Sequence, residues 1–247
     1  MLPTLQIGPL AMPTGPLLLL LGVWLGTWLA EREADRSGLN RDAVSALALL
    51  GLSIGLVGAR LGYAARYVEA YAADPLSLIS NNLATFSLPE GVVVGLVAAA
   101  LYGHRQGLPI RRTLDALAPL FGVLSAALAL AQLASGDGFG APAQLPWSLY
   151  LWDEYRHPSQ LYALLATLGV FGLWWRWGRA GFDGFGFLLM TAGLAAATVF
   201  LEAFRGDSAL IAGGWRSAQV GGLIVLAAAL VWMRRWAESA PPGQSRT

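Results

Sequence analysis

Long runs of apolar residues recur along the whole chain, separated by short polar connections that are rich in arginine. Each run has about the length that an α-helix needs to cross the hydrocarbon core of a bilayer. The pattern predicts seven membrane helices, at approximately 15–31, 43–66, 88–103, 113–134, 157–177, 184–204 and 217–236. A transmembrane β-barrel would show short segments of alternating polarity instead.

We therefore expect an all-α membrane protein that forms a single polytopic domain over residues 1–247. The longest connection, residues 135–156, contains three glycines and two prolines and is predicted to be a turn-rich extracytoplasmic loop. Residues 237–247 are predicted to be a flexible cytoplasmic tail. No convincing internal repeat is present, which argues against a transporter built from two related halves.

The composition narrows the class further. The chain is 56% hydrophobic and 13% charged, about half the charge of a typical soluble domain. It has no cysteine and two histidines, so we expect no disulfide, no metal site and no cofactor. The net charge of +1 gives no reason to expect a nucleic-acid partner. No basic residue precedes the first apolar run, so the N-terminus does not resemble a cleaved signal peptide.

Arginine indicates how the chain crosses the membrane. All 16 basic residues are arginines, and eleven of them fall on one side of the predicted spans. The positive-inside rule assigns that side to the cytoplasm. The N-terminus is therefore predicted to lie outside and the C-terminus inside.

Five arginines lie instead at or near the outer ends of the predicted spans. They are Arg60, Arg66, Arg156, Arg205 and Arg216. A single such residue would be explained by snorkelling of its charge toward water. Five together suggest that an anionic group is held near the outer leaflet, because guanidinium groups bind phosphate bidentately and stay charged. A phospholipid head group is the obvious candidate.

The second predicted span has two distinct faces. Glycines recur at i, i+4, i+7 and i+11, and these are Gly51, Gly55, Gly58 and Gly62. They predict one smooth face for close helix packing. Arg60 and Tyr63 fall on another face, where they either belong to an interfacial aromatic belt or contact a head group.

Two carboxylates lie in contexts that allow a structural or a chemical role. Glu90 follows Pro89 at the start of the third span, where a negative charge suits the helix dipole. Placed more deeply, it would pair with an outer arginine or act as a base. Asp137 belongs to the stretch Gly-Asp-Gly-Phe-Gly at 136–140, in which glycine permits positive φ angles and a structural turn is the default.

Polar groups also open the fifth span and close the sixth. The stretch Arg156–Tyr162 reads Arg-His-Pro-Ser-Gln-Leu-Tyr. Its His157 and Gln160 are three apart and share a helix face, and His157 is predicted to cap and hydrogen-bond rather than transfer protons. Glu202 and Arg205 have the same spacing. They form either a local ion pair or an arrangement in which Glu202 orients Arg205 toward a phosphate.

These motifs, in this order, resemble those of the bacterial prolipoprotein diacylglyceryl transferase family. The matching stretches are Ile7–Leu10, Gly58–Tyr63, Gly136–Gly140, His157–Tyr162 and Leu201–Arg205. The resemblance covers nearly the whole chain, and it agrees with seven spans and an outside N-terminus. It also implies a multi-pass location in the bacterial plasma (inner) membrane.

The resemblance further implies a reaction. A diacylglyceryl group passes from phosphatidylglycerol to the lipobox cysteine of a preprolipoprotein signal peptide, and glycerol phosphate leaves. Such a site must form a thiolate and stabilise the phosphate. The resemblance assigns an essential family arginine to Arg205, with Glu202 and Glu90 as further catalytic candidates. The candidates for substrate binding are Arg60, Tyr63, Asp137, Arg156, His157, Gln160, Tyr162 and Arg216.

Several positions depart from the family pattern. Ala129 stands where the family signature has an arginine, and Gln132 stands near its asparagine. Pro89–Gly91 replaces a His-Gly-Gly motif, and Ala163 replaces a glutamate. Loss of a phosphate-binding arginine from a dry site costs about a hundredfold or more in rate.

Three interpretations follow from this pattern. The chain is a divergent transferase with an altered donor or acceptor, or a non-catalytic phospholipid-binding relative, or an unrelated transporter or channel. The order of the motifs and the missing repeat make the third the weakest. Retained transferase activity is left open by the departures.

Overall fold

A computed structural model describes residues 4–7, 10–80, 85–211 and 213–240. The chain divides into two compact units. Unit 1 comprises Met1–Glu33 and Leu114–Thr247, and unit 2 comprises Ala34–Thr113. The division falls within two long helices, α1 (Thr14–Arg36) and α5 (Ile110–Ser135), most of which belong to unit 1.

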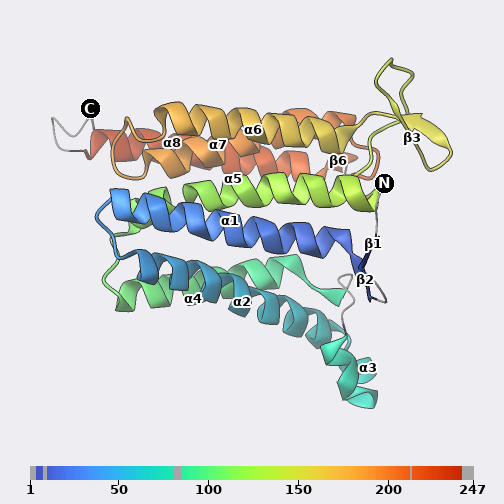
Figure 1. Cartoon of the computed structure of the whole chain (residues 1–247), viewed down its shortest axis with the longest axis horizontal. Helices are drawn as coiled ribbons and strands as arrows, with labels where there is room; N and C mark the ends of the chain where they lie inside the picture. Colours follow the sequence, from blue (N-terminus) through green and yellow to red (C-terminus); the bar gives the residue numbers. More distant parts are fainter. Residues whose placement is uncertain (1–3, 8–9, 81–84, 212, 241–247) are drawn as a thin grey trace. The chain divides into compact units, whose positions relative to one another are not determined.

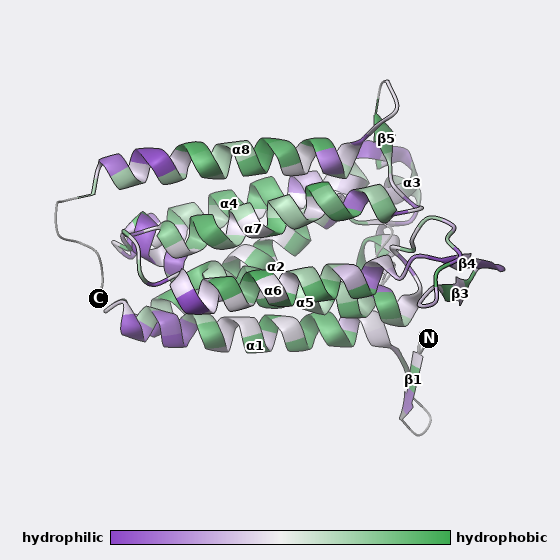
Figure 2. Cartoon of the chain, turned by 90° about the horizontal axis from the view of Figure 1, so that it is seen from above, coloured by the Kyte–Doolittle hydropathy of each residue, from purple (hydrophilic) through white to green (hydrophobic). Residues whose placement is uncertain are grey.

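Unit 1 is built from helices that lie side by side and three small hairpins (Figure 1). Besides α1 and α5, its helices are α6 (Ser159–Trp177), α7 (Phe185–Leu201), the 3₁₀ turn η3 (Glu202–Phe204) and α8 (Ser217–Glu238). The antiparallel hairpins pair β1 (Thr4–Ile7) with β2 (Leu10–Pro13), β3 (Leu149–Leu151) with β4 (Glu154–Arg156) and β5 (Leu210–Ile211) with β6 (Trp215–Arg216). Figure 2 shows that the middles of α6, α7 and α8 are hydrophobic, as a membrane helix requires.

Small residues let the helices of unit 1 approach one another closely. A Cβ atom on Gly22 of α1 would lie 2.5 Å from the Cβ of Ala127 on α5. On α5, Gly122 faces Phe171 and Met190 in the same way. In lipid, where apolar burial gives no driving force, such close contact supplies the packing energy that joins helices.

Two polar contacts fix the ends of the helices opposite the β3–β4 hairpin. The carboxylate of Asp115 accepts hydrogen bonds from the backbone N–H groups of Gly184 at 2.7 Å and Phe187 at 3.0 Å, and so caps α7. Arg179 donates to both oxygens of Glu33, at 2.9 and 2.8 Å. The guanidinium of Arg179 also lies 5.3 Å from the ring centroid of Trp174. Asp115 thus joins the start of α5 to the start of α7, and Arg179 joins the segment after α6 to the end of α1.

Unit 2 contains α2 (Arg41–Arg66), α3 (Val68–Ala73), the 3₁₀ helix η1 (Pro75–Ile79) and α4 (Leu88–Arg105). The glycine face predicted for the second span is confirmed, because it packs against glycines of α4. A Cβ on Gly55 would lie 3.0 Å from the carbonyl oxygen of Gly91. A Cβ on Gly95 would lie 2.7 Å from the carbonyl oxygen of Gly51. The two backbones are therefore in direct contact.

A helix lies at each of the seven ranges that the sequence predicts as spans. Five of these helices, α1, α2, α5, α7 and α8, are long and apolar enough to cross a membrane. The helices α4 and α6 have 18 and 19 residues, and both carry polar groups in their first turn and an arginine in their last. The described residues thus support a helical membrane protein with five apolar spans, and a count of seven stays a prediction.

The connection between α5 and α6 contains two short strands besides its turns. It holds the β3–β4 hairpin, whose turn residues Trp152 and Asp153 have φ angles of 54° and 62°. Two successive positive φ angles form the turn that suits the twist of a hairpin. The sequence did not predict this hairpin, because Trp-Asp lacks the Asn-Gly or Gly-rich signal of such turns. At the other end of the chain, the predicted tail overlaps the end of α8, and residues 241–247 lie outside the described residues.

Candidate functional site

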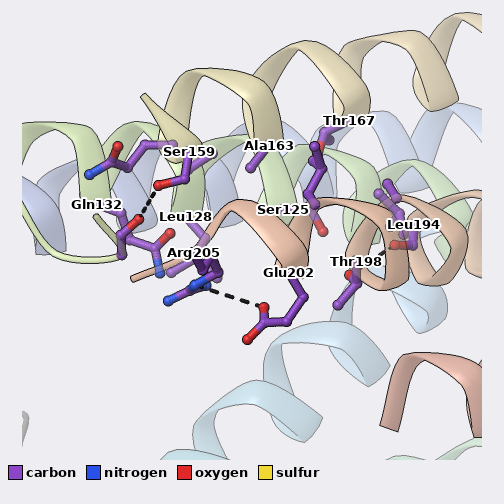
Figure 3. A pocket seen from close by; sticks show the side chains of 15 residues that line it. Ser125, Leu128, Gln132, Ser159, Ala163, Thr167, Leu194, Thr198, Glu202 and Arg205 are labelled. Carbon is purple, nitrogen blue, oxygen red and sulfur yellow. Dashed lines mark hydrogen bonds and ion pairs between the residues drawn. The ribbon is translucent and has the colours of Figure 1, made fainter. Parts of the chain in front are cut away.

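A cavity of about 190 Å³ opens in unit 1 among α5, α6, α7 and the segments that follow them. Its lining residues are Ser125, Leu128, Ala129, Gln132, Gly138, Ser159, Gln160, Ala163, Thr167, Leu194, Ala197, Thr198, Leu201, Glu202 and Arg205. Figure 3 shows Ala163 and Thr167 of α6 on one side, with Thr198, Glu202 and Arg205 on another. Three motifs that are far apart in the sequence therefore meet at one cavity.

Each helix contributes one face to this cavity. On α6, Gln160, Ala163 and Thr167 follow the i, i+3, i+7 spacing that places side chains on one side of a helix. On α5, Ser125 and Gln132 are seven apart and share a face. Sequence reasoning missed the hydroxyls of Ser125, Thr167 and Thr198. Their spacing relative to the polar motif residues was the signal that could have found them.

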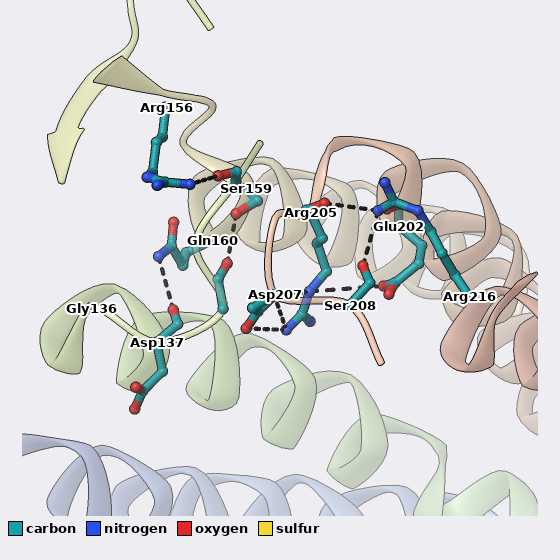
Figure 4. Close-up of polar contacts among 12 residues, drawn as sticks. Gly136, Asp137, Arg156, Ser159, Gln160, Glu202, Arg205, Asp207, Ser208 and Arg216 are labelled. Carbon is teal, nitrogen blue, oxygen red and sulfur yellow. Dashed lines mark hydrogen bonds and ion pairs between the residues drawn. The ribbon is translucent and has the colours of Figure 1, made fainter. Parts of the chain in front are cut away.

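The Gly136–Gly140 turn forms the end wall. Gly136 and Gly138 have φ angles of 85° and 64°, which favour glycine. Two side chains of the first turn of α6 hold the loop in place. The Ser159 hydroxyl donates to the carbonyl oxygen of Gly138 at 2.6 Å, and Gln160 Nε2 donates to that of Asp137 at 2.9 Å (Figure 4). Asp137 itself is exposed, and its carboxylate accepts a hydrogen bond from Ser135 at 2.7 Å.

Glu202 and Arg205 carry the charges of the cavity wall. The Glu202 side chain is 4% exposed and lies 3.8 Å from Arg205 Nε, so the predicted ion pair is present but loose. Arg205 makes shorter contacts with Asp207, since its Nε and Nη2 each donate to that carboxylate at 3.0 Å. Sequence reasoning did not single out Asp207. The Arg205 side chain keeps 31% of its surface exposed at the rim.

Arg156 and Arg216 act on the loops around the cavity rather than on its interior. Arg156 donates to the carbonyl oxygens of Leu151 and Gly140, and to Glu154 at 2.7 Å. Arg216 Nη1 donates to the carbonyl oxygens of Glu202 and Arg205, and to the Ser208 hydroxyl. Neither arginine is among the residues that line the cavity. Contact of these two arginines with a lipid phosphate therefore stays a prediction, and in the structure their hydrogen-bond partners are backbone carbonyls, Glu154 and the Ser208 hydroxyl.

His157 and Tyr162 belong to an aromatic cluster next to the cavity. The rings of His157 and Phe204 have centroids 5.3 Å apart, and the Tyr162 ring lies 6.0 Å from both. Trp147 Nε1 donates to the Tyr162 hydroxyl at 2.7 Å. The backbone N–H of His157 donates to the carbonyl oxygen of Ala141 at 3.0 Å. The Tyr162 side chain and the His157 backbone thus join the connection between α5 and α6 to the start of α6.

The remaining candidates belong to unit 2 and have partners there. Arg60 is 7% exposed and donates to the carbonyl oxygens of Ser77, Leu78 and Thr85 and to the Ser80 hydroxyl. Glu90 accepts hydrogen bonds from Ser87 and Arg66. Tyr63 stacks on Tyr67 with ring centroids 4.8 Å apart. Four of the five N–H bonds of Arg60 thus hold the loop between α2 and α4.

Two of the positions that depart from the family pattern line the cavity. Ala129 and Ala163 are wall residues, so small side chains stand where the resemblance assigns an arginine and a glutamate. Gln132 lines the same cavity and lies against Gly138. The cavity wall is therefore uncharged at the two positions where the resemblance assigns an arginine and a glutamate.

Comparison with known proteins matches this arrangement to one family. The family model for prolipoprotein diacylglyceryl transferase matches residues 3–235. A phosphatidylglycerol–prolipoprotein diacylglyceryl transferase of Bacillus cereus is 28% identical over 94% of this chain and 91% of its own length. The protein of that name from Synechococcus elongatus is 28% identical over 97% of this chain and 90% of its own. A third, from Aliivibrio fischeri, is 33% identical over 64% of this chain and 59% of its own. The chain therefore belongs to the prolipoprotein diacylglyceryl transferase family.

Proposed function

We propose that the protein binds phosphatidylglycerol at the cavity of unit 1 and transfers its diacylglyceryl group to the cysteine of a prolipoprotein. The observation that carries this proposal is the meeting of the Gly136–Gly140 turn, the Ser159–Gln160 helix start and the Glu202–Arg205 segment at one cavity. These segments resemble the family motifs, and the similar proteins from Bacillus cereus and Synechococcus elongatus carry the name of this activity.

The proposal includes a membrane arrangement. We infer seven spans, with α4 and α6 crossing together with the five apolar helices, the N-terminus outside and the C-terminus in the cytoplasm. The distribution of arginine supports this orientation. It sets the cavity motifs at the extracytoplasmic ends of α5, α6 and α7. The expected location is the plasma (inner) membrane of a bacterium.

In the proposed reaction, the cysteine thiol gives up its proton. Its sulfur then attacks the carbon of the diacylglyceryl unit that is bonded to the phosphate oxygen. The carbon–oxygen bond to phosphate breaks as the carbon–sulfur bond forms, and glycerol phosphate leaves with the electron pair. Glu202 is our candidate to accept the thiol proton, because it is the carboxylate that lines the cavity. Arg205, at the rim, is our candidate to stabilise the phosphate, while Asp207 holds its guanidinium in position.

A second candidate function has its own supporting observation. Ala129 and Ala163 leave the cavity wall uncharged at two points, and Arg205 is already neutralised by carboxylates. These features favour a phospholipid-binding relative that performs no transfer. In that case the protein would act beside an active transferase.

One experiment separates the two candidates. The purified chain is incubated with phosphatidylglycerol and a lipobox peptide, with Arg205→Ala as the control. Transfer predicts a thioether-linked peptide that is lost in the control. Retention of the lipid with no modified peptide, at stoichiometric protein, would favour the second candidate.

A further inference from the structure

Gln160 carries a buried hydrogen-bond acceptor that no described residue satisfies. The side chain is 1% exposed, lines the cavity, and its Oε1 has no hydrogen-bond partner. The orientation of the amide is fixed by its other end, because Nε2 donates to the carbonyl oxygen of Asp137. A flipped amide would set two oxygens against each other. The unpaired atom is therefore the oxygen Oε1 and not the nitrogen. Buried acceptors normally have a hydrogen-bond partner.

Two acceptors in the cavity wall, the Gln160 oxygen and the Glu202 carboxylate, favour a donor over an anion. Arg205 carries one positive charge, while Glu202 and Asp207 carry two negative charges within 4 Å of it. With Arg216, whose Nη1 donates to the carbonyl oxygens of Glu202 and Arg205, the four charges balance to zero. A phosphate pushed past Arg205 into the cavity would meet the Glu202 carboxylate and the Gln160 oxygen, which both repel it.

The walls favour a neutral donor over an ammonium group. Leu128, Ala129, Ala163, Leu194 and Leu201 supply apolar surface, in which a charged group loses its hydration. Arg205 at the rim repels a second cation. The cavity volume is about 190 Å³. Because water occupies about 30 Å³ per molecule, the cavity has room for about six water molecules, and so for a small polar head group.

We propose that the cavity recognises the hydroxyl groups of a phospholipid head, with Gln160 Oε1 accepting a hydrogen bond from one of them, and that the phosphate stays at the rim beside Arg205. This inference rests on the proposed function in taking a phospholipid as the ligand. It adds that selection depends on the hydroxyls of the head group and not on its phosphate.

The test compares lipids that differ only at the hydroxyls. Phosphatidylpropanol has the phosphodiester charge and the three-carbon head of phosphatidylglycerol but no hydroxyl. Each lipid is titrated in phosphatidylcholine nanodiscs that contain the full chain, and competition with labelled phosphatidylglycerol gives the relative affinities. Phosphatidylethanolamine serves as the ammonium arm. The expected preference for phosphatidylglycerol over phosphatidylpropanol is about three- to tenfold, the range of one or two neutral hydrogen bonds.

Two variants connect this preference to the cavity. Gln160→Leu removes the acceptor, and the preference should fall to about one. Gln219→Leu is the matched control, because Gln219 also donates to a backbone carbonyl, that of Val199 at 3.1 Å, and does not line the cavity. If Gln160→Leu does not fold, Ala163→Leu fills the cavity and leaves the bond from Gln160 to Asp137 in place, with the same expected loss of preference.

The outcomes are distinct. Equal affinity for phosphatidylglycerol and phosphatidylpropanol would overturn the inference, with water then satisfying Gln160, while lipid binding as proposed would stand. A preference for phosphatidylethanolamine would overturn it in favour of a cation. If none of the three lipids competes above the phosphatidylcholine background, the proposed function fails together with the inference.

Discussion

Arg205 illustrates how far a single residue could be predicted. The spacing of Glu202 and Arg205 predicted their pairing, and the structure has it at 3.8 Å. The tighter partner, Asp207, is three residues beyond the end of η3, where backbone direction depends on the fold and not on helical periodicity. The same limit applies to Arg156 and Arg216, whose carbonyl partners come from loops that periodicity does not describe.

Substitution of Arg205 tests its proposed contact with phosphate. Arg205→Ala should lower the rate of transfer by about a hundredfold or more, because a donor aimed at developing charge is lost. Arg205→Lys should recover only part of the rate, since a point charge lacks the planar fork of arginine. Initial rates of thioether formation measure both. Arg234→Ala, which removes an exposed arginine of α8, is the control and should change nothing. An Arg205→Ala rate within threefold of the wild type would contradict the role.

Glu202→Gln tests the proposed proton acceptor without changing its size. The rate of transfer should fall by about 10²- to 10⁴-fold, the usual contribution of a general base. Binding of phosphatidylglycerol should persist, which separates the loss from misfolding. A transfer rate close to that of the wild type would show that the thiol proton goes elsewhere.

Helices were the elements that the sequence predicted best. Apolar runs fixed all seven helix positions, and the glycine spacing of α2 identified its packing face, because both signals are local and periodic. The β3–β4 hairpin was missed, since its turn residues carry no standard turn signal. The cavity faces of α5, α6 and α7 were found only in part, because their apolar lining resembles ordinary helix packing.

The contact between α2 and α4 can be tested with one methyl group. A Cβ on Gly91 would lie 2.7 Å from Ala59 Cβ and 2.8 Å from the Gly55 carbonyl oxygen, so Gly91→Ala should destabilise the protein by about 1–3 kcal/mol. Gly169→Ala on α6 is the matched control, because its Cβ would meet no atom within 4 Å. Thermal unfolding in detergent should show a lower midpoint for the first variant alone. Equal midpoints for both would mean that the two helices are not closely packed.

At the scale of the whole molecule, the chain is a helical membrane protein of a transferase family whose cavity differs from the family pattern. The family could be recognised from the order of its motifs. The division into two compact units could not be predicted, because it depends on contacts between distant segments. That Ala129 and Ala163 line the same cavity could not be predicted either, because they lie on different helices, α5 and α6.

The absence of cysteine makes the membrane orientation directly measurable. Gln144 lies before the β3–β4 hairpin and Gln106 follows α4, and both are exposed. In intact cells, a membrane-impermeant maleimide should label Gln144→Cys and leave Gln106→Cys unlabelled until the cells are opened. The reverse pattern would invert the proposed topology. Labelling of both residues in intact cells would contradict it.

The central claim is that this cavity carries out diacylglyceryl transfer, and one measurement tests it most directly. The purified chain is mixed with phosphatidylglycerol that carries deuterated acyl chains and with a lipobox peptide, and the peptide is analysed by mass spectrometry. The account predicts a peptide whose cysteine has gained the full deuterated diacylglyceryl group, absent with Arg205→Ala. A peptide that stays unmodified after long incubation, with lipid bound to a folded protein, would contradict it.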